Sequence, residues 1–262
     1  MSLSGCGPMV ELLARRAPVL QALRQDPSGK GDLMARLDVS RSTVDRSIRE
    51  LQSNDLIERV EGTYRPTLAG RIALASYEEF SDRAESVQAD TDILACLPPD
   101  APLSTDLLVG SETVRAEPTA PQRPIEALQQ AVASADRIRG SVVGVTAQFV
   151  DAYRRRVASG CEIELVVAAD ALSRLVGQYA DAVEELIESG RVELREVEST
   201  PPYSLKIYDS DGERRVAVAV YGDNSLRALI RNDTSEAVRW AEDRYGQLRA
   251  ASEPVTGQRS DR

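Results

Sequence analysis

Histidine is absent from the 262 residues of this chain, and no other gap in the composition excludes as much chemistry. Without an imidazole there is no His-based acid–base catalysis, no His metal ligand and no His to activate a nucleophile. The three cysteines, Cys6, Cys96 and Cys161, lie far apart and form no CxxC pair, so neither a metal site nor a disulfide framework is expected. The motifs GxSxG and GxxxxGK(S/T) are missing as well. We therefore expect no metal, no cofactor and no enzymatic activity, with an uncharacterised α/β enzyme as the alternative.

Long apolar segments are also lacking. The first ten residues have neither the positive charge nor the apolar run of a signal peptide, and no stretch approaches 18 continuous apolar residues. The sequence thus predicts a cytoplasmic protein that makes no contact with a membrane.

Lysine is rare, because Lys30 and Lys206 are the only two and the other 30 basic residues are arginines. Acidic residues number 42, the net charge is -10, and aromatic residues make up only 4% of the chain. Such a composition is typical of salt-adapted cytosolic proteins, in which molar cation screens the repulsion between carboxylates. We expect a halophilic origin, and an Arg-rich, GC-rich genome is the alternative explanation.

The negative charge is concentrated in the second part of the chain. Residues 1–75 contain 11 basic and 9 acidic residues, whereas residues 76–262 contain 21 and 33. A length of 262 residues favours two domains. We divide the chain into a DNA-binding domain at 1–75, a connecting helix at 76–97 and an α/β effector or regulatory domain at 98–262, because a charge asymmetry of this kind indicates that one end meets a polyanion.

The first segment predicts three short helices and a hairpin. The helices are expected at residues 10–24, 30–37 and 41–53, with Ser40 as the N-cap of the third. Val44, Ile48 and Leu51 recur at helical spacing and form its core stripe. Two alternating strands follow around Glu61 and Gly62.

The polar face of the third helix is suited to contact DNA. Arginine reaches guanine or phosphate, while Ser, Thr and the first helical N–H groups anchor phosphates. The hairpin would add basic residues at its tip. The predicted DNA-binding residues are Arg41, Ser42, Thr43, Arg46 and Arg49 on the helix and Arg59, Tyr64 and Arg65 on the hairpin.

The stretch SRSTVDRSIRELQSNDLIERVEGTYRPTLAGR resembles the winged-helix DNA-binding domains of archaeal and bacterial transcription regulators. The resemblance covers roughly residues 10–75 and implies double-stranded DNA as a partner. The alternative is a winged helix that binds another protein. Arg46 and Arg49 distinguish the two, because DNA binding should depend on them and protein binding need not.

A long helix is predicted from Leu68 to about Ala95, with Thr67 as its N-cap. Ala73, Phe80, Val87 and Leu94 repeat every seven residues, and Tyr77, Ala84 and Thr91 occupy the intervening offset. This heptad pattern predicts a homodimer seam. The alternative is one amphipathic helix packed on its own C-terminal domain.

The part of the chain after the long helix predicts an α/β domain with an antiparallel edge in its later strands. We expect strands at 107–109, 141–145, 161–168, 192–197, 203–208, 214–221 and 226–231, and helices at 125–139, 147–158, 171–189 and 235–250.

Within this part, SLKIYDSD at residues 204–211 fits the spacing of the HxKxxxxD motif of phospholipase D-like proteins, with Ser204 in place of the His. The nucleophile and general acid of that family are its two His residues, so hydrolysis by that mechanism is excluded here. Lys206 could equally be an ordinary surface lysine.

Longer stretches carry a wider resemblance. GSVVGVTAQFVDAYRRRVASGCEIELVV, PPYSLKIYD and VAVAVYGDNSLRALIRNDTSEAVRWAEDRY resemble the effector domain of archaeal winged-helix regulators of the methanogenesis-filament-regulator type, common in haloarchaea, and more distantly the TrmB regulators. The resemblance implies a one-component transcription regulator whose phospholipase D-like domain has exchanged catalysis for sensing or oligomerisation.

A small-molecule effector would bind where strand ends and the following loops converge. The candidate effector-binding residues are Thr146, Gln148, Tyr203, Ser204, Lys206 and Asn224. A phosphorylated or carboxylated metabolite would suit Lys206. The alternative is a domain used only for dimer contacts.

Overall fold

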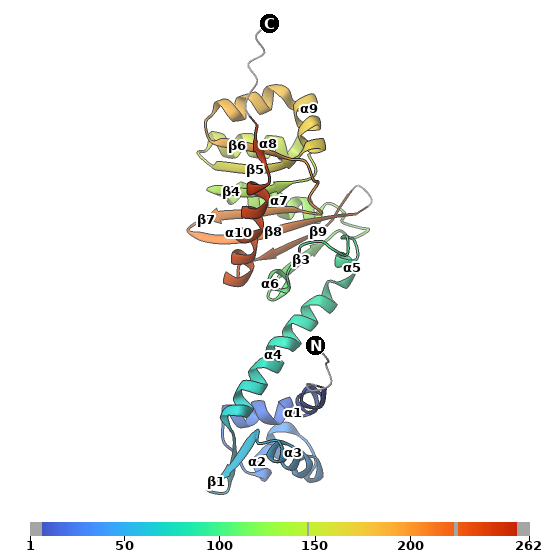
Figure 1. Ribbon diagram of the computed structural model, residues 1–262, viewed down its shortest axis with the longest axis vertical. Coiled ribbons are helices and arrows are strands. Elements are labelled where there is room, and N and C mark those ends of the chain that lie inside the picture. The colour runs from blue at the N-terminus through green and yellow to red at the C-terminus, as the bar shows by residue number, and fades with distance from the viewer. Residues whose placement is uncertain (1–6, 146, 223–224, 256–262) are drawn as a thin grey trace. The chain divides into compact units, whose positions relative to one another are not determined.

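The computed structural model describes residues 7–145, 147–222 and 225–255 (Figure 1). The chain divides into two compact units, Met1–Glu85 and Ser86–Arg262, and the boundary falls within helix α4 (Leu68–Ala89). Each unit is described by itself. No helix among the described residues is both long and apolar enough to cross a membrane.

The first unit consists of helices, one hairpin and a shared apolar core. Its elements are α1 (Gly7–Gln25), α2 (Lys30–Leu37), α3 (Arg41–Ser53), β1 (Ile57–Val60), β2 (Thr63–Pro66) and the start of α4. Leu20, Leu23, Leu33, Leu51 and Leu56 are fully enclosed in the core. Each such side chain stabilises the fold by about 2 kcal/mol relative to exposure. The three predicted helices and the hairpin are all present.

Helix α3 forms as the sequence predicts. Ser40 Oγ accepts a hydrogen bond from the backbone N–H of Thr43 at 3.3 Å and caps the helix. The stripe of Val44, Ile48 and Leu51 is buried, so the opposite face of the helix lies at the surface. The hairpin turns at Glu61 and Gly62, whose φ angles are 48° and 87°. Positive φ at both central residues is the requirement of a two-residue type I′ turn, and glycine meets it without strain.

Helix α4 begins as predicted and ends earlier. Thr67 Oγ1 accepts a hydrogen bond from Gly70 N at 3.0 Å and caps the helix. The predicted end near Ala95 is wrong, because α4 stops at Ala89 and a separate turn, α5, spans Thr91–Leu94. The break coincides with Asp90, which is buried.

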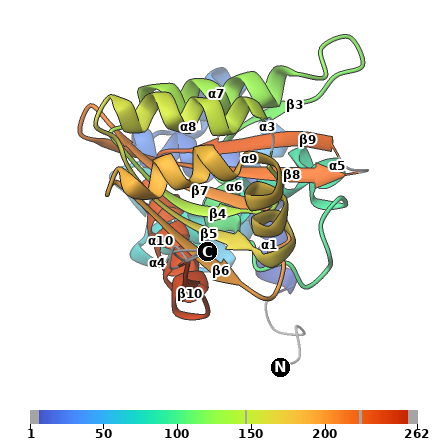
Figure 2. The same ribbon diagram turned by 90° about the horizontal axis from the view of Figure 1, so that it is seen from above.

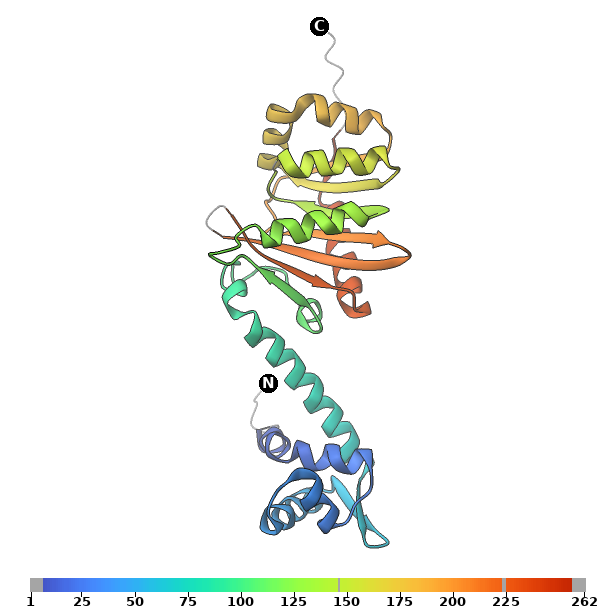
Figure 3. The same cartoon turned by 180° about the vertical axis from the view of Figure 1, so that it is seen from behind.

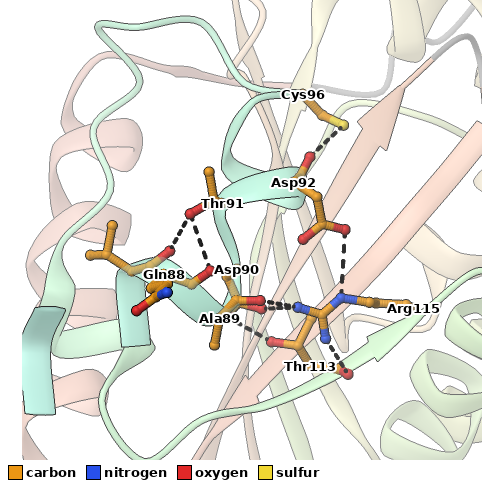
Figure 4. Close-up of polar contacts among 9 residues, drawn as sticks. Gln88, Ala89, Asp90, Thr91, Asp92, Cys96, Thr113 and Arg115 are labelled. Carbon is orange, nitrogen blue, oxygen red and sulfur yellow. Dashed lines mark hydrogen bonds and ion pairs between the residues drawn. The ribbon is translucent and has the colours of Figure 1, made fainter. Parts of the chain in front are cut away.

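Arg115 holds this break in place from strand β3 (Glu112–Arg115) (Figure 4). Its Nη2 donates to the carbonyl oxygen of Ala89 at 2.7 Å and to Asp90 Oδ1 at 2.5 Å. Thr113 Oγ1 donates to Asp90 Oδ2 at 3.0 Å. A cation at the last carbonyls of a helix satisfies groups that have no helical partner and interacts favourably with the helix dipole. These tertiary contacts explain why the periodic pattern overestimates the length of α4.

The predicted heptad seam is correspondingly shorter. Leu94 belongs to α5, and Ala73 and Tyr77 pack against the core of the first unit. Phe80 is 60% exposed and Val87 is 38% exposed. The apolar surface that α4 leaves open along this repeat is therefore confined to about two heptads.

The second unit is built on one mixed sheet of eight strands in the order β10-β6-β5-β4-β7-β8-β9-β3. Strands β4, β5 and β6 run parallel, and every other neighbouring pair is antiparallel. The remaining bounds are α6 (Thr105–Leu108), α7 (Arg123–Ser134), β4 (Arg137–Val142), α8 (Ala147–Ala158), β5 (Glu162–Ala168), α9 (Ala169–Glu188), β6 (Val192–Val197), β7 (Ser204–Ser210), β8 (Glu213–Gly222), β9 (Ser225–Asn232), α10 (Ser235–Ala250) and β10 (Glu253–Pro254). The expected α/β class and the antiparallel later strands are confirmed.

Helices cover both faces of this sheet. Helices α7, α8 and α9 lie over one face, as Figures 2 and 3 show, and their apolar residues form one core with β4, β5 and β6. Helix α10 and the short α5 and α6 contribute to a second core on the other face, which includes Tyr203, Val218 and Ile230. A sheet buried on both faces explains the apolar runs Leu165–Ala168 in β5 and Val216–Val220 in β8.

Three predicted elements of the second unit differ. The segment at 107–109 is not a strand, because Ser104 accepts a hydrogen bond from Asp106 N at 3.1 Å and starts the helical turn α6. The helix expected at 125–139 ends at Ser134, and β4 begins at Arg137 rather than Ser141. Asp136 N donates to the carbonyl oxygen of Asp209 at 2.7 Å, so pairing with the neighbouring strand draws the chain out of the helix.

Candidate functional site

The exposed face of α3 carries the predicted helix residues of the DNA-binding set. Arg41, Arg46 and Arg49 are exposed, and so are Ser42 and Thr43 in the first turn. Ser42 Oγ and Thr43 Oγ1 each lie 2.9 Å from Ser40 Oγ, so the hydroxyls form a cluster at the beginning of the helix. The capping geometry thus places hydroxyl groups, the first turn of the helix and arginines on one surface.

Ion pairs neutralise the acidic residues of α3. Glu50 Oε2 accepts from Arg16 Nε at 2.9 Å, and Glu50 Oε1 lies 3.2 Å from Arg46 Nε. Lys30 Nζ donates to Asp45 Oδ1 at 2.6 Å. The hydrogen bond from Arg16 lowers the pKa of Glu50, and that from Lys30 lowers the pKa of Asp45. Arg16 of α1 and Lys30 of α2 supply a counter-charge to each acidic residue of α3, so the arginines of α3 give its exposed face a positive character.

The hairpin presents two of its three predicted residues. Arg59 and Arg65 are exposed on β1 and β2. The prediction that Tyr64 contacts DNA is wrong, because its side chain is only 5% exposed and belongs to the core. Its backbone N–H donates to the carbonyl oxygen of Ser28 at 2.9 Å, which ties β2 to the loop before α2. The Arg59 guanidinium carbon lies 5.9 Å from the centre of the Tyr64 ring, so the tyrosine positions an arginine instead of contacting a partner.

A second candidate site is a cavity of about 60 Å³ in the second unit, lined by Ser204 and Lys206 of β7. It lies at the point in the sheet where parallel β4 meets antiparallel β7. The backbone ladder between these strands ends at Gly140 and Lys206, while β4 stays paired with β5 as far as Val142. The strands are no longer paired beyond this point, which is where ligand sites in α/β sheets are expected.

Beyond Gly140 and Lys206, side-chain hydrogen bonds replace the backbone hydrogen bonds between β4 and β7. Ser141 Oγ accepts from Leu205 N at 3.1 Å, and Ser204 Oγ accepts from Val143 N at 3.1 Å. Lys206 Nζ donates to the carbonyl oxygen of Ser141 at 2.6 Å and, more weakly, to that of Leu205 at 3.4 Å. Lys206 is only 4% exposed. Burial lowers the pKa of its amine from 10.5 to about 7.

The rest of the lining was not predicted from the sequence. Phe149 and Tyr153 of α8 and Tyr221 of β8 face the cavity, and Tyr221 Oη lies 3.4 Å from Ser204 Oγ. Burial raises the pKa of both tyrosines. Phe149 and Tyr153 are four residues apart on α8, and this spacing places them on one face of a helix but gives no indication of a cavity.

Two predicted effector residues lie elsewhere. Tyr203 is fully buried on the opposite face of the sheet, where its hydroxyl donates to the carbonyl oxygen of Pro102. Gln148 is exposed, and its Oε1 accepts from Gln129 Nε2 at 3.4 Å. Thr146 and Asn224 lie outside the described residues. Ser204 and Lys206 are therefore the two predicted residues that line the cavity.

The structure separates the polar residues of the phospholipase D-like spacing. Lys206 lies in mid-strand opposite Ala217, whereas Asp211 occupies the turn after β7 with a φ of 54°. Five residues of strand span roughly 16 Å, so the two side chains do not share a site. Among the described residues, no group of three or more His, Cys, Asp or Glu side chains could hold a metal ion.

Two family models match this chain. The model described as methanogenesis regulatory protein FilR1, middle domain, matches residues 121–251. The model described as HVO_A0261 N-terminal domain matches residues 9–89. No protein of curated function matches the chain.

Among solved structures, the chain is similar to TrmBL2, described as an archaeal chromatin protein with a novel mode of DNA binding. The identity is 16%, the alignment covers 95% of this chain and 99% of that one, and the TM-score is 0.45. A phosphatidylserine synthase from Haemophilus influenzae has 12% identity, coverages of 55% and 39% and a TM-score of 0.40. A polyphosphate kinase from Porphyromonas gingivalis has 13% identity, coverages of 61% and 31% and a TM-score of 0.39. Because the scores and identities are low, none of these likenesses supports a conclusion about function.

Proposed function

We propose that this chain, which belongs to the family of the methanogenesis regulatory protein FilR1 middle domain, is a transcriptional regulator that binds double-stranded DNA through its first unit. The family match covers half of the chain, and its description is that of a regulatory protein. Regulation is therefore the role that family membership supports. The features that bear on DNA contact lie in the first unit.

The observation that carries DNA binding is the exposed face of α3. A short helix, a tight connection and a second helix with a polar, Arg-bearing surface are what a recognition helix requires. Arg41, Arg46 and Arg49 lie on that surface, and the hairpin that follows adds Arg59 and Arg65. We interpret the first unit as a winged helix, with α3 in the major groove and the hairpin against the backbone or minor groove.

We also propose that the regulator is a homodimer joined through α4. Phe80 and Val87 are seven residues apart on one face of the helix, and both are exposed although apolar. A second copy of α4 would cover them, and a two-fold dimer would present two recognition helices to a pseudo-palindromic operator.

The second unit has the features of a sensor. It contains an apolar cavity with a buried lysine, and the chain has no histidine to act as the nucleophile or general acid of a phospholipase D-like enzyme. We propose that this domain binds a small molecule and is not an enzyme. The structure adds no support to the phospholipase D-like resemblance, because the lysine and aspartate of that sequence spacing lie apart.

Selective DNA binding tests the main proposal. The purified full-length protein is titrated in molar KCl with the duplex upstream of its own gene and with a scrambled duplex of the same composition. Preferential binding of the first duplex supports a sequence-specific regulator. Equal, weak binding of a panel of upstream duplexes and of the scrambled duplex would favour the alternative, in which the first unit contacts a protein.

A further inference from the structure

We infer that the cavity beside Lys206 binds a small monocarboxylic acid, with the carboxylate paired to Lys206 and a short hydrocarbon body in the apolar space beneath α8 and α9. The inference rests on the proposal that the second unit is a sensor, and it names the chemical class of the ligand.

The buried amine of Lys206 favours a negatively charged ligand. Within the described part of the chain, the hydrogen-bond partners of Lys206 Nζ are two carbonyl oxygens, at 2.6 and 3.4 Å. Among the residues that the structure describes, no carboxylate lies within ion-pair distance of it. Burying an ammonium group without a counter-charge is costly, and a removable carboxylate would offset that cost. A ligand that brings one negative charge therefore completes a site that the protein leaves incomplete.

Neighbouring hydroxyl groups can donate hydrogen bonds to such a ligand. Ser204 Oγ and Tyr221 Oη line the same cavity as Lys206 and lie 3.4 Å apart, a long and weak hydrogen bond. Either hydroxyl can rotate its proton toward an incoming oxygen. A carboxylate has two oxygens, so it can accept from the ammonium group with one and from a hydroxyl with the other.

Size and lining restrict the rest of the ligand. The cavity measures about 60 Å³ and its walls are overwhelmingly apolar, formed by residues such as Val145, Phe149, Leu165, Leu175 and Val183. A sugar phosphate would bring several hydroxyls that find no partners there and a double charge that faces a single lysine. Acids with three or four carbon atoms suit both the volume and the apolar walls, so the structure favours a carboxylated over a phosphorylated ligand.

Because binding of the acid is coupled to proton uptake, the affinity for the acid should change with pH in a defined direction. Burial lowers the pKa of Lys206 to about 7, and a carboxylate would favour the charged amine. Among the described lining residues, the other titratable groups are Tyr153 from α8 and Tyr221 from β8, and burial raises the pKa of both. Both therefore stay neutral around pH 7 to 9. Above about pH 7 the protein must take up a proton to bind the acid, so the affinity should fall by up to about tenfold per pH unit.

Calorimetric titration of the full chain tests the inference. Sodium propionate and sodium butyrate are the probes, and butyramide, inorganic phosphate and glucose 6-phosphate are the comparison ligands. Lys206→Met removes the amine while keeping an unbranched apolar side chain, and Lys30→Met serves as the matched control because Lys30 is the only other lysine and lies in the first unit. We expect saturable binding of an acid, at least tenfold weaker in Lys206→Met and unchanged in Lys30→Met.

Lysine-selective isotope labelling gives a second readout that does not depend on a variant folding. The chain contains two lysines, so the NMR spectrum contains two side-chain signals to follow. The acid should raise the pKa of the Lys206 signal and leave the Lys30 signal unchanged. No saturable binding of either acid, equal binding of butyramide, tighter binding of the phosphates, or full affinity in Lys206→Met would each overturn the inference.

The DNA titration keeps this inference separate from the proposed function. If the protein binds its upstream duplex selectively and neither acid binds, the ligand class is wrong while the regulator stands. If an acid binds at Lys206 and no duplex is bound selectively with or without it, the cavity assignment stands and the proposed function fails.

Discussion

Lys206 is the residue whose energetics the structure constrains most tightly. Its pKa is about 7 in the folded protein and 10.5 in the unfolded chain, so between these values the unfolded state binds a proton that the folded state lacks. The free energy of unfolding should therefore rise with pH across this window, by about 1.4 kcal/mol per unit for this one group. Below pH 7 both states are protonated and the contribution of Lys206 no longer changes.

The Lys206→Met variant isolates this contribution. We predict that it is more stable than the wild type near pH 7 and that the difference shrinks toward pH 9, because methionine buries no charge. Denaturant unfolding of both proteins at pH 7, 8 and 9 measures it. Parallel stability curves for the two proteins would show that Lys206 does not titrate in this range.

Gly140 permits the close contact between β4 and β7 beside the cavity. A Cβ at this position would lie 1.9 Å from the carbonyl oxygen of Leu205, which is backbone and cannot rotate away. We predict that Gly140→Ala destabilises the second unit by about 3 kcal/mol. Gly246→Ala is the control, since its Cβ would meet nothing within 4 Å in α10 and alanine favours the helix by up to about 1 kcal/mol. Equal unfolding midpoints for the two variants would refute the predicted clash.

The sequence identified the site residues that stand out by residue type or motif spacing. It misplaced the residues whose role depends on which face of a strand they occupy. Lys206 and Ser204 stood out because a lysine is rare here and because of the motif spacing. Tyr64 and Tyr203 were assigned to surfaces that they do not occupy, because both lie in or beside short strands where a shift of one residue exchanges the two faces. Their burial is decided by tertiary contacts with Ser28 and Pro102, which no local pattern encodes.

At the scale of elements, the end of α4 depends on Asp90. Its carboxylate is buried and bonded to Arg115 and Thr113 (Figure 4). We predict that Asp90→Ala destabilises the second unit by about 1–3 kcal/mol, because the Arg115 pair is lost in a partly buried setting. Asp92→Ala should cost less than about 0.5 kcal/mol, since Asp92 is 66% exposed and lies 3.7 Å from Arg115 Nε. Thermal unfolding of both variants gives the comparison, and equal losses would contradict the role of Asp90.

Several element boundaries were predictable because local signals agree with the fold. Helices α2, α8 and α10 and strand β6 begin and end where the sequence predicts them, and Ser40 caps α3 as expected. The failures arose where a tertiary contact overrides the pattern. Arg115 ends α4 before its apolar repeat does, and the pairing of Asp136 with Asp209 ends α7. The order of the strands in the sheet also depends on long-range pairing that the sequence does not display.

For the whole molecule, the apolar face of α4 leads to a prediction of the oligomeric state. We predict that the wild type is a dimer and that Phe80→Glu/Val87→Glu is a monomer, because two exposed apolar side chains at heptad spacing are replaced by like charges. Light scattering coupled to size exclusion measures the mass. A wild-type monomer, or a double variant that remains dimeric, would remove α4 from the dimer interface.

The distribution of charge over the molecule predicts how DNA binding responds to salt. The first 75 residues have a net charge of only +2, and residues 76–262 have a net charge of -12. We expect a shallow dependence of affinity on salt and a large share of base and shape readout, because counterion release scales with the phosphates neutralised, about 0.9 per contact. A steep fall in affinity between roughly 0.2 and 2 M KCl would contradict this expectation.

The central claim is that the exposed face of α3 reads DNA, and one measurement tests it most directly. Fluorescence anisotropy with a duplex that the wild type selects, in molar KCl, compares Arg46→Ala/Arg49→Ala with Arg174→Ala/Arg239→Ala. The control pair removes the same charge from exposed positions of the second unit. The account predicts that the α3 variant loses selective binding, by at least about tenfold for two base or phosphate contacts, while the control binds like the wild type. Equal affinities for the two variants would contradict the assignment of α3 as the recognition helix.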